Sequence, residues 1–441
     1  MTTFRLLLLA LFLCAPAAHS DGLPRPLSDA DFIPVNEDEA RLGWLLFYDP
    51  ILSGNRNISC ASCHHPRFAT ADGVSLTLGE GGIGLGPSRR ADPDNLPERR
   101  LPRNSTALFN LGAADLPALF HDGRIELDPT RKAGFRTPLE DDMASGFSGI
   151  VSAQTMFPVL SQDEMAGHYS ENDVAQAVRQ GRITGPGGAW DIIARRVAAI
   201  PEYSARFREV YPHLDAPGDI HFTDISNAIA AFMAFEWRSD DSAFDRHLRG
   251  EATLEGAAAA GMELFYGPSG CADCHAGPFL TDHGFHAMGM PQIGPGKVGR
   301  FERHARDEGR FRVTANPADL FAFRTPALRN VARTGPWGHD GAYSDLEAFV
   351  ADHADPKAAP ERYNRAQAVL PALPGASDFA VMDDPAEVAA LRKAATDWGV
   401  ALSGTEIAAL VAFLESLTDE AAIAGRLGVP DAVPSGLPVE R

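Results

Sequence analysis

Positively charged residues are few in this 441-residue chain, which has 39 Lys and Arg residues against 59 Asp and Glu residues. The resulting formal charge of −20 argues against nucleic acid or an anionic membrane surface as the partner, because both repel an acidic protein. Disorder is also excluded, since 45% of the residues are hydrophobic. At roughly 150 residues per domain, the length predicts two or three domains.

Long apolar runs are missing as well, because no stretch after the N-terminus reaches the ~18 residues that a membrane helix needs. The N-terminus has Arg5, then an apolar run over residues 6–13, then small residues over 15–20. This order is typical of a secretory signal peptide. We therefore expect residues 1–20 to be removed and the mature protein to be periplasmic and not membrane-spanning. A retained N-terminal anchor is the alternative.

Cysteine is rare, with five residues in all, of which Cys14 lies in the predicted signal peptide. The other four lie in two matching segments, residues 60–64 (CASCH) and residues 271–275 (CADCH). Two disulfides, a thioredoxin-type site and a zinc site can all use C-x-x-C pairs. In both segments, however, His follows the second Cys at once, and no βαβ pattern surrounds either segment.

C-x-x-C-H is the attachment pattern of c-type haem, in which both thiols bond to the porphyrin and the adjacent His binds the iron. Two such segments in one exported chain predict two covalently bound c-type haems. The haem-attaching residues are Cys60, Cys63, Cys271 and Cys274, and the proximal iron ligands are His64 and His275.

The surroundings of the two haem segments are repeated along the chain. Gly43, Leu46, Phe47 and Tyr48 precede the first segment, and Gly261, Leu264, Phe265 and Tyr266 precede the second at the same spacing. Residues 103–110 also match 324–330, and residues 120–123 match 338–341. Since strand signals are scarce, and residues 79–103 and 291–299 read as long loops, we predict two copies of one mostly helical unit, each with a haem.

With these motifs, the chain resembles the bacterial di-haem cytochrome c peroxidase and MauG family over residues 37–418. The resemblance implies a mainly α fold of two cytochrome-c-like helical haem domains with long loops. Residues 21–240 would form the N-terminal peroxidatic domain, and residues 241–441 the C-terminal electron-transfer domain. An alternative is that the C-terminal helix packs back on the first domain.

The resemblance also implies a distal pocket over the first haem, built from Gln154, Pro158 and Glu164. A carboxylate within hydrogen-bond reach of peroxide can take a proton from one oxygen and return it to the other, which is worth ~10²–10⁴-fold in rate. Gln154 would orient the peroxide, and Pro158 would limit the space. The alternative is that Gln154 and Glu164 are ordinary solvated residues of a helix or loop.

The sixth ligands decide which haem can react. After His65, which adjoins the proximal ligand, the chain has no His before His121, so we expect an open position on the first haem. In the family, the distal ligand of the second haem lies fourteen residues after the His of a His-Asp-Gly motif and is usually Met or Tyr. The same offset from His339 gives His353, which can bind iron through neutral imidazole. Met288 and Met290 are alternatives.

Two further sites follow from the resemblance. His121 stands where relatives place a Trp between the haems as an electron relay, and imidazole is much harder to oxidise than indole. Asn104, Thr334 and Pro336 match the family's calcium site, where one amide oxygen and two backbone carbonyls suit a hard cation such as Ca²⁺. An ordinary turn is the alternative for the calcium site.

These features predict a periplasmic di-haem peroxidase that reduces hydrogen peroxide to water with electrons from a small cytochrome c or a cupredoxin. The first alternative is a MauG-like enzyme that oxidatively modifies a side chain of a partner protein. A pure di-haem electron carrier is the second alternative. The sequence leaves open the donor, any protein substrate and the oligomeric state, with a homodimer as one option.

Overall fold

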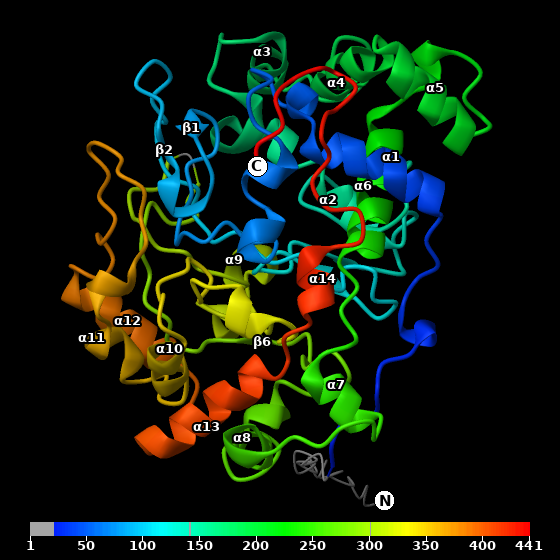
Figure 1. Cartoon of the computed structure of the whole chain (residues 1–441). Coiled ribbons are helices and arrows are strands. Elements are labelled where there is room, and N and C mark those ends of the chain that lie inside the picture. The colour runs from blue at the N-terminus through cyan, green and yellow to red at the C-terminus, as the bar shows by residue number, and fades with distance from the viewer. Residues whose placement is uncertain (1–21, 141–142, 300) are drawn as a thin grey trace, which may run out of the picture.

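The computed structural model describes residues 22–140, 143–299 and 301–441 (Figure 1). The predicted signal peptide over residues 1–20 lies outside the described residues. Helices dominate the described part of the chain, and its strands are only two or three residues long, so the prediction of a mainly α-helical fold is confirmed. The domain boundary between residues 240 and 241 stays a prediction. None of the described helices has the length and apolar character needed to cross a membrane.

The α-helices are α1 (Glu37–Tyr48), α2 (Ile150–Gln154), α3 (Asp173–Arg179), α4 (Ala189–Ala198), α5 (Pro201–Val210), α6 (Phe222–Glu236), α7 (Ala243–Leu248), α8 (Gly256–Phe265), α9 (Phe311–Thr314), α10 (Leu346–His353), α11 (Ala359–Arg362), α12 (Pro385–Ala394), α13 (Gly404–Glu415) and α14 (Glu420–Ala424). Four short helical turns belong to the sites described below: η3 (Cys60–Ser62), η7 (Pro158–Leu160), the π-helical η8 (Gln162–Ala166) and η10 (Cys271–Asp273).

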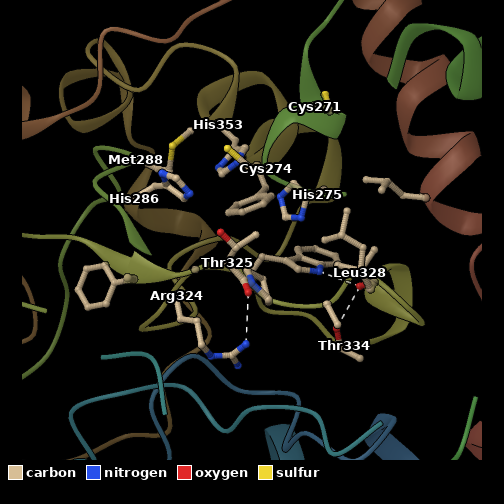
Figure 2. Close-up of a pocket in the computed structure, with 18 of the residues that line it drawn as sticks. Cys271, Cys274, His275, His286, Met288, Arg324, Thr325, Leu328, Thr334 and His353 are labelled. Carbon is tan, nitrogen blue, oxygen red and sulfur yellow. Dashed lines mark hydrogen bonds between the residues drawn. The ribbon is translucent and has the colours of Figure 1, made fainter. Parts of the chain in front are cut away.

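The strands are β1 (Gly82–Ile83), β2 (Arg90–Ala91), β3 (Ala118–Leu119), β4 (Ile125–Leu127), β5 (Phe135–Arg136), β6 (Phe285–His286) and β7 (Phe323–Arg324). They form small antiparallel sheets in which β1 pairs with β2, β4 pairs with both β3 and β5, and β6 pairs with β7. The β6–β7 pair matters for the sites, because Arg324 on β7 points toward segments of the first half, drawn in blue and cyan (Figure 2).

Helices α1 and α13 begin at side-chain caps. The side-chain oxygen of Asn36 accepts the N–H groups of Asp38 and Glu39 at the start of α1. At the start of α13, Ser403 and Glu406 accept each other's backbone N–H groups in a capping box. Such caps satisfy N–H groups that have no partner within the helix, and acidic side chains in the first turn suit the helix dipole.

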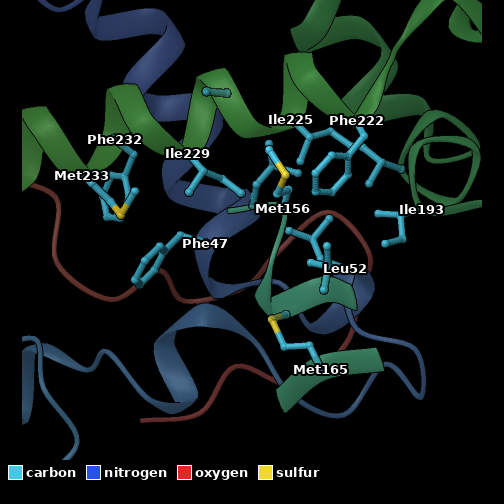
Figure 3. Close-up of a cluster of buried hydrophobic side chains, with 14 of the residues drawn as sticks. Phe47, Leu52, Met156, Met165, Ile193, Phe222, Ile225, Ile229, Phe232 and Met233 are labelled. Atoms are coloured by element: carbon cyan, nitrogen blue, oxygen red, sulfur yellow. The ribbon is translucent and has the colours of Figure 1, made fainter. Parts of the chain in front are cut away.

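The repeat seen in the sequence corresponds to two similar helix crossings. In the first half, α1 packs on α6, and the ring of Phe47 lies 5.2 Å from that of Phe232 (Figure 3). In the second half, α8 packs on α13, and the ring of Phe265 lies 5.0 Å from that of Phe413. Each haem segment therefore follows a helix that is anchored in its own hydrophobic core.

A glycine allows the close approach in each crossing. A Cβ atom on Gly43 would lie 1.8 Å from the carbonyl oxygen of Ala228 on α6, and a Cβ atom on Gly261 would lie 1.9 Å from that of Ala409 on α13. Real Cβ atoms never come so close to a backbone oxygen. The matching glycines in the sequence repeat are therefore explained by backbone contact between helices.

The segments after α13 return to the first half. Ala422 of α14 and Val433 are part of the first hydrophobic core. The indole N–H of Trp44 donates to the Gly428 carbonyl, and the Glu236 carboxylate accepts the N–H groups of residues 427 and 428. Helix α13 itself stays in the second core, so the part of the chain that packs back is α14 and the residues that follow it.

Replacing Gly43 with Ala is expected to lower the free energy of unfolding of the haem-loaded protein by about 1–3 kcal/mol, because α1 and α6 must move apart. Gly261→Ala is expected to do the same through α8 and α13. The control is Gly404→Ala at the start of α13, where an added Cβ meets no atom within 4 Å. Denaturant unfolding followed by circular dichroism measures all three, and equal stability of Gly43→Ala and Gly404→Ala would contradict the explanation.

Candidate haem sites

The first haem segment is a turn that presents one nitrogen of His64. The N–H of His64 donates to the Cys60 carbonyl at 3.0 Å, which closes the turn that begins with η3. The ring Nδ1 of His64 lies 3.1 Å from the Thr70 carbonyl and therefore carries the proton of that hydrogen bond. The hydroxyl of Ser105 donates to the Cys63 carbonyl at 2.6 Å and braces the same turn. Nε2 of His64 is left as the nitrogen with a lone pair for a metal.

The second haem segment repeats this arrangement. The N–H of His275 donates to the Cys271 carbonyl at 3.0 Å, and its Nδ1 donates to the Leu280 carbonyl at 3.2 Å. Burial lowers the pKa of both imidazoles, of His64 and of His275, which favours the neutral form that binds metal. None of the four cysteines of the two segments forms a disulfide, which disagrees with the disulfide alternative.

A cavity of about 400 Å³ opens beside the second segment (Figure 2). Cys271, Cys274, His275 and His353 line it. The ring centroids of His275 and His353 are 6.3 Å apart. An imidazole nitrogen binds a transition metal at about 2 Å, which puts the ring centroid about 3 Å from the ion. Two rings on opposite sides of one iron would have centroids roughly 6 Å apart, so the observed spacing fits a shared iron.

His353 has the other properties of a ligand. Burial lowers its pKa to about 3, so the ring is neutral, and its buried Nδ1 has no hydrogen-bond partner among the described residues. The alternative ligands Met288 and Met290 also line the cavity. Figure 2 shows Met288 beside His286, whose Nε2 lies 2.8 Å from an oxygen of Asp282.

Arg324 supplies a positive charge to the wall of this cavity. Its guanidinium donates to the carbonyls of Phe120 and Thr325, and no carboxylate of the described residues lies within ion-pair distance. Burial lowers the pKa of Arg324 to about 10, so the side chain remains a cation at neutral pH. A buried cation needs an anionic partner, and a haem propionate would be one. The sequence repeat contained Arg324 but gave no sign of this role.

The predicted distal residues lie on three consecutive short helices. Gln154 ends α2, Pro158 opens η7, and Glu164 lies in the middle of the π-helical η8. Turns η7 and η8 pack against each other. A π-helical turn adds a residue to the ordinary helix and often occurs at functional sites. The Ser161 carbonyl accepts the N–H groups of Glu164 and the two residues after it, which fixes the turn.

Glu164 is half-buried, and side chains of both charge signs act on it. Burial raises its pKa, whereas the positive charges of Arg124 and Lys297 lower it. The negative charge of Glu164 also helps to raise the pKa of the Cys63 thiol, although burial is the main cause. Lys297 comes from the second half, and burial lowers its pKa to about 8. Nothing in the sequence pointed to Lys297.

A buried ion network connects this pocket to the second half. Arg103 holds Asp122 at 2.7 Å and Asp307 at 2.6 Å, and the side chains of all three are at least nine-tenths buried. Arg124 donates to Asp122 at 3.1 Å and lies over the ring of Phe120, with its guanidinium carbon 3.4 Å from the centroid. The resemblance contained Arg103 and Asp122, but Asp307 was missed because no motif surrounds it.

His121 lies between the two halves and lines the cavity. Its carbonyl accepts the N–H of Arg324 at 2.8 Å. Burial holds the pKa of His121 well below its usual value, so its ring is neutral. Beside it, the rings of Phe323 and His339 are stacked with centroids 3.8 Å apart.

The residues of the predicted calcium site all line the same cavity. The amide nitrogen of Asn104 donates to the carbonyls of Val74 and Ser75, at 2.9 and 3.1 Å. The amide oxygen of Asn104 therefore points away from those carbonyls. Thr334 is half-buried and Pro336 is buried. The calcium site stays a prediction.

The family model for di-haem cytochrome c peroxidase matches residues 37–253. Among curated proteins, the chain is 28% identical over 336 residues to the methylamine utilization protein MauG of Methylorubrum extorquens, covering 76% of this chain and 72% of that protein. It is also 28% identical over 355 residues to the cytochrome c551 peroxidase of Pseudomonas aeruginosa, covering 78% of this chain and 82% of that protein.

Solved structures show the same fold. A MauG-like protein associated with microbial copper homeostasis has a TM-score of 0.57 and 25% identity, covering 94% of this chain and 97% of that one. The diheme peroxidase BthA of Burkholderia thailandensis has a TM-score of 0.59 and 21% identity, covering 96% of this chain and 97% of that one. Together with the two C-x-x-C-H segments, these similarities to di-haem cytochrome c peroxidases support a peroxidase-type oxidoreductase with two c-type haems.

Proposed function

We propose that this protein is a periplasmic di-haem peroxidase that reduces hydrogen peroxide to water with electrons from a small cytochrome c or a cupredoxin. One observation carries the proposal: a half-buried carboxyl group, Glu164, stands on a π-helical turn, and its charge acts on the Cys63 thiol of the first haem segment. An electron carrier has no need of an acid–base group in that position.

Each haem would be held by residues of one half. Cys60 and Cys63 would attach the first haem, and His64 would bind its iron. Cys271 and Cys274 would attach the second haem, and His275 and His353 would bind its iron. A haem with one protein ligand supplies an iron at which peroxide can be reduced, and a haem with two supplies an electron carrier. Arg324 would bind a propionate of the second haem.

The residues of the first half would transfer protons to and from peroxide. Reduction of one hydrogen peroxide to two waters consumes two electrons and two protons. Glu164 takes a proton from one oxygen of peroxide and returns it to the other, which leaves as water when the O–O bond breaks. The oxygen that remains becomes the second water by taking up the two electrons and the two protons. Gln154 donates a hydrogen bond that orients the peroxide, and Pro158 narrows the space beside it. Arg124 and Lys297 keep the ionised form of Glu164 accessible despite its burial.

The second half would bring the electrons. The net charge of −20 suits a basic donor protein, and such an encounter is sensitive to salt. His121 is the residue between the haems, but its neutral imidazole makes direct tunnelling the better route. Ca²⁺ bound by Asn104, Thr334 and Pro336 would fix the two halves beside this route.

A MauG-like reaction on a partner protein is the second candidate function. It is favoured by two similarities, to MauG and to a MauG-like solved structure at 25% identity. It is also favoured by His353, because the second haem would then lack the Met ligand that peroxidases of this family usually have. The haem architecture would be the same, and the electrons would come from a side chain of the partner.

Replacing Glu164 with Gln is expected to slow the reaction of the protein with hydrogen peroxide by ~10²–10⁴-fold, because the amide cannot accept the peroxide proton. Stopped-flow absorption of the haem measures the rate. Glu202→Gln is the control, because Glu202 is exposed on α5 and its ion-pair partner is Arg206 on the same helix. A wild-type rate in Glu164→Gln would remove the central support of the proposal.

The same rate is expected to depend on pH. Glu164 acts as a base only when ionised, and burial raises its pKa. The rate should therefore be full above this raised pKa and fall as the pH decreases through it, with a midpoint above the usual value for Glu. The Glu164→Gln variant should lack this acidic limb, and an unchanged limb in the variant would assign it to another group.

Electron paramagnetic resonance of the oxidised protein is expected to show one high-spin haem and one low-spin haem with two imidazole ligands. His353→Met should remove the bis-imidazole signal and raise the reduction potential of the second haem by roughly 0.1 V or more, because thioether ligation favours the ferrous state. Met288→Leu and Met290→Leu are the controls and should leave the signal unchanged. Loss of the signal in either control would make that Met part of the site.

The two candidate functions differ in what is oxidised. A peroxidase should turn over peroxide with a soluble reduced cytochrome or cupredoxin and leave other proteins unmodified. A MauG-like enzyme should add oxygen or cross-links to a particular partner, which mass spectrometry of co-incubated periplasmic proteins would detect. Stable modification of one partner, together with negligible turnover of every donor, would replace the first proposal with the second.

A further inference from the structure

A second group of metal-binding side chains lies outside both haem segments. Glu98 comes from the loop after β2, Asp163 from η8, and His168 from the segment between η8 and α3. One ligand atom from each of these residues lies within 4.8 Å of the others. We infer that Glu98, Asp163 and His168 bind one divalent transition-metal ion of the Zn²⁺ type.

Buried atoms without partners point to a ligand in this group. The side chain of Asp163 is only 9% exposed, and its Oδ1 is buried without a hydrogen-bond partner among the described residues. Both ring nitrogens of His168 are buried and also lack one. Folded proteins rarely leave such groups unsatisfied. A metal ion would satisfy Oδ1 of Asp163 and one nitrogen of His168 together.

Hydrogen bonds from neighbouring side chains occupy one oxygen of each acid and leave the other oxygen for the ion. Arg99 donates to Oδ2 of Asp163 at 2.6 Å, and Gln162 donates to Oε2 of Glu98 at 2.9 Å. Oδ1 of Asp163 and Oε1 of Glu98 remain, and the latter lies 3.5 Å from Nδ1 of His168. With two carboxylates and one guanidinium, the group has a net charge of −1 when His168 is neutral. Arg99 is 54% exposed and can move toward solvent.

The donor set selects the class of metal. One imidazole and two carboxylates suit Zn²⁺, which binds both at about 2.0–2.2 Å, whereas Ca²⁺ and Mg²⁺ prefer oxygen ligands alone. Ligand atoms around such an ion lie roughly 3–4 Å apart, so the group has to contract by about 1 Å. Three protein ligands leave a fourth position for water.

A metal ion bound by this group would connect two segments of the chain. Asp163 directly precedes Glu164 on η8, and the Asp163 carbonyl accepts the N–H of Glu80 at 3.0 Å. An ion shared with Glu98 and His168 would tie the loop after β2 to the π-helical turn. It would therefore hold the turn on which Glu164 stands. Metal binding itself requires neither peroxide nor turnover, so the inference stands apart from the proposed function.

Calorimetric titration of the haem-loaded protein with Zn²⁺ tests the inference. The protein is used without an affinity tag, after treatment with a chelator, and in excess Ca²⁺ so that oxygen-only sites are filled. One equivalent of Zn²⁺ should bind, and His168→Gln, Asp163→Asn and the exposed Glu98→Gln should each weaken binding roughly tenfold or more. The matched control is His304→Gln, which removes another surface His–Glu pair, 3.7 Å from Glu302, and should bind Zn²⁺ like the wild type.

Thermal unfolding gives a second readout. Zn²⁺ should raise the unfolding temperature of the wild type and of His304→Gln, but not of His168→Gln, because only a bound ion stabilises the folded state. The haem spectrum and the unfolding temperature without Zn²⁺ check that each variant is folded. If Asp163→Asn does not fold, Glu98→Gln decides, since its side chain is 64% exposed. Absence of binding to the wild type, or wild-type affinity in His168→Gln and Glu98→Gln, would overturn the inference.

Discussion

A hydrogen bond from an imidazole to a backbone carbonyl sets the geometry of both haem sites. His64 donates to Thr70 and His275 donates to Leu280, and both acceptor residues have left-handed backbone angles, with φ of 64° and 55°. Residues other than Gly adopt such angles only where the surrounding structure holds them. The turn that brings the carbonyl to the ring fixes the proton on Nδ1, so Nε2 faces the haem side. In each half, the helix that precedes the haem segment is anchored in a hydrophobic core, and the turn follows that helix.

The two halves are joined by charges in the interior, and this has consequences for the pocket. Arg103 binds Asp122 in its own half and Asp307 in the other. Loss of one partner would leave a buried charge uncompensated, which is more costly than the pair itself is stabilising. Arg124, which also binds Asp122, is one of the two cations that act on Glu164. The contact between the halves and the electrostatics around Glu164 therefore depend on one network.

The sequence predicts what is local or repeated. The C-x-x-C-H segments, the glycine-bearing helices before them and the mainly helical fold could all be read from residue types and spacing, because each depends on contacts within a short window or on a copy elsewhere. The π-helical turn at Glu164 and the charge of Lys297 near it could not. The sequence suggested that a C-terminal helix returns to the first half, but it did not show that the returning helix is α14 and not α13. These features depend on residues that are distant in the sequence, such as Asp163 and Glu80 or Trp44 and Gly428.

The most informative difference between the halves lies where the repeat breaks down. His121 and His339 are matching positions, and the residue fourteen positions after His339 is His353, at the end of α10. The residue fourteen positions after His121 is Phe135, which is buried on β5. A phenyl ring cannot bind iron, and a strand has replaced the helix that would carry a ligand. At this position the same backbone plan thus offers an imidazole in one half and a phenyl ring in the other, where Glu164 stands on a different turn. This difference supports one haem that reacts and one that passes electrons.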